Sequence, residues 1–233
     1  MKTELIAYFI PCLLLLVLLG ILLFIALPRS YQKQFGEKYD FKRSFPFEML
    51  YAKNEYLPFG RAIIVSNFVI GFIASAFFLA STSLYPSFVS MAIVCFIAGA
   101  FSSLLGMATT LIRADIQIKA HVLAFSLFGV TSVAFDAMNL IAYFHMVDIL
   151  PALAYIFIGL TIALGLAKLI LMLNPKLSNW SRLESSVDEQ GVVTHSRPKV
   201  FVIAFTEWML QFGQWLSLLT SLIAFFVFAM MLL

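Results

Sequence analysis

The chain has 233 residues, of which 62% are hydrophobic and 12% charged, and its mean hydropathy is +0.99. A soluble domain carries about 25% charged residues, so this chain lacks the polar side chains that would cover a water-soluble globule. Its formal net charge of +3 is modest, and acidic residues are mixed with the basic ones beside apolar segments, which favours binding to anionic lipid over binding to nucleic acid.

Six apolar stretches are each long enough to form a helix across the hydrocarbon layer, which takes about 20 residues. They cover residues 5–27, 62–84, 88–112, 120–144, 149–173 and 200–233. The first stretch is longer than the apolar core of a signal peptide, and no cleavage site of small residues follows it, so we expect it to be retained. The sequence therefore predicts an all-α fold, a polytopic transmembrane helical bundle of about six spans that forms a single membrane domain (residues 1–233).

The basic residues indicate how this bundle is oriented. Three loops, at about 28–60, 113–119 and 174–199, hold twelve of the 15 Lys and Arg residues, and Arg61 directly after the first loop makes thirteen. Cytoplasmic loops hold the excess of basic residues in membrane proteins, so we expect these loops in the cytoplasm and both termini outside. The size of the chain favours a bacterial inner (plasma) membrane.

The first long loop is rich in aromatic residues, including Tyr39, Phe45 and Phe47. Pro46 is suited to open a short helix over 47–56. Aromatic rings interleaved with Lys and Arg suit the headgroup layer, so we expect this loop to pack on the cytoplasmic face, and a partner or lipid-headgroup site is the alternative. The loop 174–199 is polar and is typical of a flexible connector.

Two of the six segments carry small residues at helical spacing. Gly99, Ser103 and Gly106 lie in the third segment, and Gly159 and Ala163 lie in the fifth. Small residues let helix backbones approach closely in lipid, so both groups predict helix-packing faces.

The fourth segment carries a polar stripe. Ser132, Asp136, Asn139 and Tyr143 are spaced i, i+4, i+7 and i+11, which places them on one face of a helix, with Asp136 near the middle of the bilayer. An ionisable side chain at that depth costs ~2.5–3.5 kcal/mol on insertion scales and suggests a functional group. Two interpretations stay open: a site that responds to protons or cations or anchors a substrate, and a structural hydrogen-bond node between helices.

The last segment carries Glu207, Gln211 and Gln214 on one face, and at 34 residues it is longer than the hydrocarbon requires. We expect Glu207 in the cytoplasmic headgroup region, with the two glutamines deeper and facing Asp136. Lys168 and His121 lie near segment ends, and we expect both at the interface, Lys168 by snorkelling.

No motif for a metalloprotease, a serine hydrolase or a nucleotide-binding loop is present in the sequence, and we expect no cofactor, no metal site and no catalytic residue. The leading hypothesis is a non-enzymatic, transporter-like protein that binds or moves a small or lipophilic molecule, or a membrane subunit of a larger complex. The alternatives are an intramembrane enzyme acting on a lipid or isoprenoid substrate and a membrane sensor or regulatory protein. Membrane lipids and other membrane-protein subunits are the expected partners.

Overall fold

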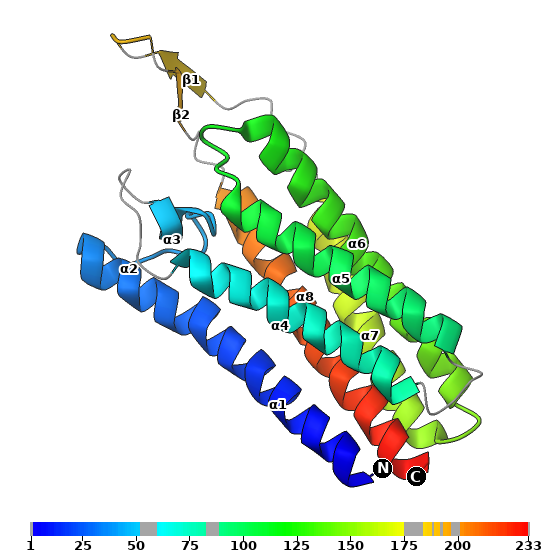
Figure 1. The fold of residues 1–233 in the computed structure, drawn as a ribbon. Coiled ribbons are helices and arrows are strands. Elements are labelled where there is room, and N and C mark those ends of the chain that lie inside the picture. Colours follow the sequence, from blue (N-terminus) through cyan, green and yellow to red (C-terminus); the bar gives the residue numbers. More distant parts are fainter. Residues whose placement is uncertain are drawn as a thin grey trace.

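The described residues of the computed structural model form six long helices, which lie side by side with consecutive ones running in opposite directions (Figure 1). The structure describes residues 2–51, 60–82, 89–174, 184–187, 189–191, 193–196 and 201–232. In chain order the elements are α1 (Lys2–Ile21), the π-helix η1 (Leu22–Ala26), α2 (Leu27–Phe35), α3 (Glu48–Tyr51), α4 (Gly60–Thr82), α5 (Val89–Leu111), α6 (Ile118–Met146), α7 (Pro151–Met172), β1 (Glu184–Val187), β2 (Val193–Ser196) and α8 (Phe201–Leu232). The predicted all-α bundle is confirmed, and the five later long helices begin and end within two residues of the predicted ranges.

The first helix is longer than expected because α1, η1 and α2 follow one another without a break. Pro28 has no backbone N–H to continue the α-helical pattern, and Leu27 N–H bonds to Leu22 O, five residues earlier. The helix ends at Gly36, whose φ of 72° is left-handed and whose N–H bonds to Gln32 O. Glycine adopts this conformation without strain, so it closes the helix.

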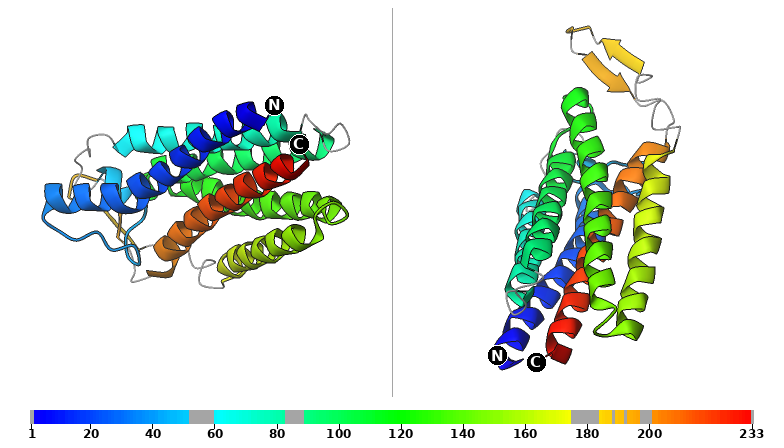
Figure 2. Two further views of the ribbon diagram at one scale, coloured as in Figure 1. Left: turned by 90° about the horizontal axis from the view of Figure 1, so that it is seen from below. Right: turned by 90° about the vertical axis from the view of Figure 1, so that its right-hand side faces the viewer.

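Helix α8 occupies the centre of the bundle. It contacts α1, α4, α5, α6 and α7, and in both views of Figure 2 it runs between α1 on one side and α6 and α7 on the other. Polar side chains on α8 can therefore form hydrogen bonds with residues of several neighbouring helices.

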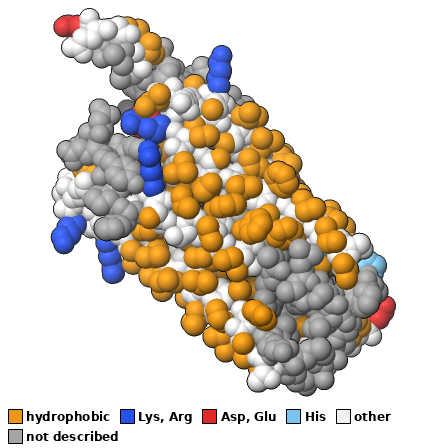
Figure 3. All heavy atoms as spheres, in the orientation of Figure 1, with side chains coloured by type: hydrophobic (Ala, Val, Ile, Leu, Met, Phe, Trp, Pro, Cys, Tyr) orange, Lys and Arg blue, Asp and Glu red, His pale blue; other side chains and the backbone are white. Residues whose placement is uncertain are grey.

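Apolar side chains cover most of the described surface on the face of the bundle seen in Figure 3. Large ones are exposed on every long helix whose surface is described, for example Tyr8, Leu123 and Ile170. Five of the described helices are long and apolar enough to cross a membrane, and α4 is a sixth apolar helix of 23 residues. The surface and the helix lengths are those of an integral membrane protein.

The aromatic first loop packs against one end of the bundle, the end away from both termini (Figure 1). Tyr39 and Phe45 are buried, and Trp208 of α8 donates from Nε1 to Tyr39 OH and to Ser44 O, each at 3.0 Å. Helix α3 (Glu48–Tyr51) covers the first part of the short helix predicted at 47–56, whose remainder lies outside the described residues.

The loop after α7 contains a structure that the sequence did not predict. Strands β1 and β2 pair antiparallel, with Glu184 opposite Ser196 and Val187 opposite Val193. Gly191 lies between them with a φ of 77°. The interpretation of 174–199 as a flexible connector is therefore wrong for these two strands.

The predicted packing faces have different outcomes. In α5 the small residues do pack, since a Cβ added to Gly106 would lie 3.1 Å from the Phe128 ring. In α7 a Cβ added to Gly159 would meet no atom within 4 Å, and Ala163 is exposed, so that prediction is wrong. The face of α7 that packs is instead the one with Ala154, Thr161 and Lys168.

Candidate functional site

A buried ion pair lies in the interior of the bundle. Lys168 of α7 places Nζ 2.8 Å from Asp136 Oδ2 of α6, and the two side chains are 1% and 2% exposed. Nζ is also 3.2 Å from Ser132 O and 3.2 Å from Gln214 Oε1. Nζ thus donates to Ser132 O and Gln214 Oε1 and lies at ion-pair distance from the Asp136 carboxylate.

Two glycines lie against this ion pair. A Cβ added to Gly213 of α8 would lie 3.3 Å from Lys168 Cγ, which is tight, and one added to Gly165 of α7 would lie 3.5 Å from Asp136 Oδ2, which is an ordinary contact. The backbones of α7 and α8 thus pack directly on the charged side chains. The charges are thereby held away from lipid, where an unpaired charge is costly.

Polar contacts continue along the α6–α8 interface towards the end that carries the termini. Ser132 Oγ donates to Gln214 Oε1 at 2.7 Å, Asn139 Nδ2 donates to Ser221 Oγ at 2.7 Å, and Ser221 Oγ donates to Ser217 O. Asn139 and Ser221 are buried. Beyond Ser221 the interface becomes apolar.

A second acid–base pair lies at the opposite end of the interface. His121 Nε2 is 3.2 Å from Glu207 Oε2, and both side chains are 0% exposed. His121 Nδ1 is 2.7 Å from Ile112 O, and because a carbonyl oxygen accepts, Nδ1 carries a proton. The His121–Glu207 contact is then bridged by one further proton, which resides on the imidazole or on the carboxyl group.

The first loop covers this second pair. The rings of Phe45 and Phe47 each lie 5.8 Å from the His121 ring and nearly perpendicular to it. Phe45 N–H donates to Glu48 Oε2 at 2.9 Å, which fixes the turn before α3. The loop therefore separates His121 and Glu207 from the outside of the bundle.

Together these groups form what we call the polar track: His121, Ser132, Asp136 and Asn139 of α6, Lys168 of α7, and Glu207, Gln211, Gln214 and Ser221 of α8. From Glu207 to Ser221 it covers 14 residues of α8, or ~21 Å of helix. That is about two thirds of a ~30 Å hydrocarbon layer.

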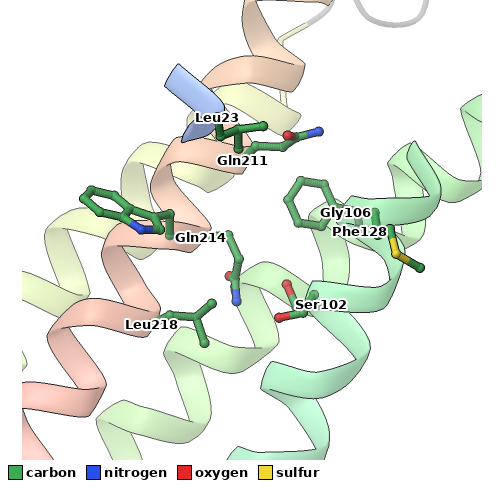
Figure 4. A pocket seen from close by; sticks show the side chains of 10 residues that line it. Leu23, Ser102, Gly106, Phe128, Gln211, Gln214 and Leu218 are labelled. Atoms are coloured by element: carbon green, nitrogen blue, oxygen red, sulfur yellow. The ribbon is translucent and has the colours of Figure 1, made fainter. Parts of the chain in front are cut away.

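A cavity lies beside the track between α5, α6 and α8 (Figure 4). Its volume is about 40 Å³, and its lining residues are Leu23, Ser102, Ser103, Gly106, Met107, Phe128, Gln211, Gln214, Trp215 and Leu218. Gln211 Nε2 donates to Thr110 Oγ1 at 2.8 Å on the side of α5. The cavity is therefore flanked by both glutamines of the polar track.

The structure brings together most of the residues singled out in the sequence. Ser132, Asp136 and Gln214 lie around one centre, and Asn139 continues the same row. Tyr143 is buried one step further on, among the rings of Phe157 and Phe225. Gln211 lies at the cavity, on the side of Gln214 away from Asn139.

One expectation about an individual residue is wrong. Lys168 does not snorkel but points inward to Asp136. A signal for Lys168 was present, because it lies one and two heptads after Thr161 and Ala154, on the helix face that packs. Glu207 and His121 are buried against each other inside the bundle, so neither side chain is exposed at its surface, and their depth in the membrane stays a prediction.

The two carboxylates do not form a catalytic pair. Asp136 pairs with Lys168, whereas Glu207 pairs with His121. His121 and Asp136 both lie on α6, 15 residues or ~22 Å apart along the helix, so Asp136 and Glu207 are far from each other. A general acid and a general base acting on one substrate must both lie within hydrogen-bond reach of it.

No protein-family model, no curated protein and no solved structure matches this chain. The geometry of the polar track is therefore the basis on which function is argued.

Proposed function

We propose that this membrane protein moves protons, alone or together with a small polar solute, along the polar track, with Asp136 and Lys168 as its charged centre. The observation that carries the proposal is the ion pair itself, at 2.8 Å and almost wholly buried. Ionisable groups inside membrane bundles are costly, and they mark ion pathways and proton relays. A bundle built for packing alone is at least as stable with apolar groups in their place.

Protons fit the arrangement better than a larger cargo does. Each of the two acid–base pairs can hold its bridging proton on either partner, and amide and hydroxyl groups lie between the pairs. The adjacent cavity of about 40 Å³ is far below the roughly 300–1,000 Å³ of pockets for drug-sized ligands. A lipophilic substrate would require a different conformation of the bundle.

Access from one side fits the same proposal. Beyond Tyr143 and Ser221 the rings of Phe157, Phe225 and Phe228 fill the interface, and Phe225 and Phe228 are buried. The rings close the track towards the termini. At the other end the first loop lies over His121 and Glu207, so access from that end requires Phe45 and Phe47 to move aside. The basic residues gather at the first-loop end, which we place in the cytoplasm of a bacterial inner membrane.

Proton flux in liposomes tests this function. The purified protein is reconstituted in vesicles that contain a pH-sensitive dye, and a potassium diffusion potential drives proton entry. We expect wild-type protein to acidify the vesicles faster than protein-free vesicles, and Asp136→Asn to slow this flux at least tenfold. The matched control is Asp148→Asn, the same change at an exposed residue of the α6–α7 turn, which should retain the flux. Wild-type vesicles no faster than empty ones would contradict the proposal.

A structural role within a larger membrane complex is the second candidate. It is favoured by the side chains of the track that bond to one another across helices, such as Asn139 to Ser221 and Ser132 to Gln214. Interhelical hydrogen bonds of this kind stabilise membrane bundles. In that case Asp136→Asn should lower the unfolding temperature in detergent, and the wild-type protein should conduct no protons.

A further inference from the structure

The side-chain amide of Gln214 has its orientation fixed by Lys168. Lys168 Nζ lies 3.2 Å from one end of this amide and can only donate, so that end is the oxygen Oε1. Ser132 Oγ donates to the same oxygen at 2.7 Å. The NH₂ group of Gln214 must therefore point the other way, towards α5.

The cavity lies in that direction. Figure 4 shows the amide of Gln214 and the hydroxyl of Ser102 facing each other across it. Gln214 is 4% exposed, and its Nε2 has no hydrogen-bond partner among the described residues. An unpaired buried donor costs about 1–3 kcal/mol, so such a group normally has a partner.

Two hydroxyl groups on the opposite wall, Ser102 Oγ and Ser103 Oγ, are also buried without a hydrogen-bond partner among the described residues. Ser103 Oγ also lies close to α4, since a Cβ added to Gly71 would be 2.5 Å from it. Three residues with unpaired polar groups thus line one cavity.

The size and charge of the cavity restrict what it can hold. One water molecule requires roughly 10–15 Å³, so about 40 Å³ has room for more than one. All the lining residues of this cavity are uncharged, and the neighbouring Lys168 is already paired with Asp136. The occupant must be small and neutral, and it must accept a hydrogen bond from Gln214.

We propose that the cavity between α5 and α8 is an internal water site, in which water accepts from Gln214 Nε2 and bonds to Ser102 and Ser103. Because Gln211 also lines the cavity, this water joins Gln211 to Gln214 and extends the polar track beside the ion pair. The inference deepens the proposed proton function by supplying mobile hydrogen-bonding groups at its centre.

Magnetisation transfer from water to side-chain amides in nanodiscs tests this site by NMR. The protein is labelled with ¹⁵N-glutamine and ¹⁵N-asparagine, and the Gln214 signal is assigned with Gln214→Leu. We expect transfer from water to the Gln214 NH₂ to be several times that to the Asn139 NH₂. Asn139 is the matched control, because it is also buried and its amide donates to Ser221.

A second variant, which fills the cavity, tests whether the transfer to Gln214 comes from water in this cavity. Ser102→Val places two methyl groups in the cavity and should abolish transfer to Gln214 while leaving Asn139 unchanged. Transfer to wild-type Gln214 no greater than to Asn139 would overturn the inference. Proton flux with a dry cavity would refute the water site alone, whereas a hydrated cavity without flux would refute the proposed function alone.

Discussion

Lys168 and Asp136 show at the scale of single residues how a charge is accommodated inside the bundle. The Lys168 ammonium donates to Ser132 O and Gln214 Oε1 and is paired with the Asp136 carboxylate. Such a pair need not stabilise the fold overall, because desolvation of both ions offsets much of their attraction. Removing only one of the two charged side chains is more costly, because the other charge is then buried without a partner.

We therefore expect the double substitution to be less destabilising than either single one. Asp136→Leu or Lys168→Met alone should lower the free energy of unfolding by about 3–5 kcal/mol, since each leaves one buried charge without its partner. The double variant Asp136→Leu/Lys168→Met should be more stable than either single variant. Denaturant unfolding in detergent measures the three values, and a double variant as unstable as the sum of the singles would contradict the ion pair.

At the scale of the helices, close approach depends on glycines that face other helices. A Cβ on Gly20 of α1 would lie 2.7 Å from the Trp215 ring, whose Nε1 donates to Leu16 O at 2.7 Å. The α1–α8 contact is thus fixed by a glycine on one helix and an indole on the other. Gly159 of α7, by contrast, faces open space.

These two glycines give a matched pair of variants. Gly20→Ala should destabilise the protein by about 1–3 kcal/mol, because the tryptophan must shift within a packed interface. Gly159→Ala should leave stability unchanged or raise it by up to about 1 kcal/mol, because alanine is the better helix former. Thermal unfolding in detergent compares them. Equal effects of the two substitutions would show that α1 and α8 do not pack as described.

At the scale of the whole molecule, both termini lie at one end of the bundle and the aromatic loop and the hairpin lie at the other (Figure 1). Lys33, Lys38, Lys42 and Arg43 belong to the helix and loop at the latter end. The exposed Asp148 lies in the α6–α7 turn at the end with the termini. This distribution of charge predicts the orientation in the membrane.

Cysteine labelling on intact cells measures that orientation. In a background with Cys12 and Cys95 replaced by alanine, Lys33→Cys should resist a membrane-impermeant maleimide until the cells are opened. Asp148→Cys should react from outside without opening. The reverse pattern would place the termini in the cytoplasm and invert the proposed direction of access to the polar track.

The sequence by itself determined the helical class, the helix positions and the presence of a polar face around Asp136. Long apolar stretches must form helices in lipid, because no water is available to satisfy the backbone. Polar residues such as Asp136 and Asn139 of α6 and the glutamines of α8 can be identified from the sequence, because a polar residue in an apolar segment is unusual whichever way the helix is turned.

Only the tertiary structure decided which face of each helix turns inward. Lipid and bundle core are both apolar, so the pattern that separates the two faces of a helix in water is weak here. For that reason Gly159 was assigned to a packing face that does not exist, and Lys168 was assigned to the interface. The rotation of α7 directs Lys168 towards Asp136, and the position of α6 beside α8 buries Glu207 against His121. Both acid–base pairs join residues from different helices, and neither partner identifies the other by its spacing in the chain.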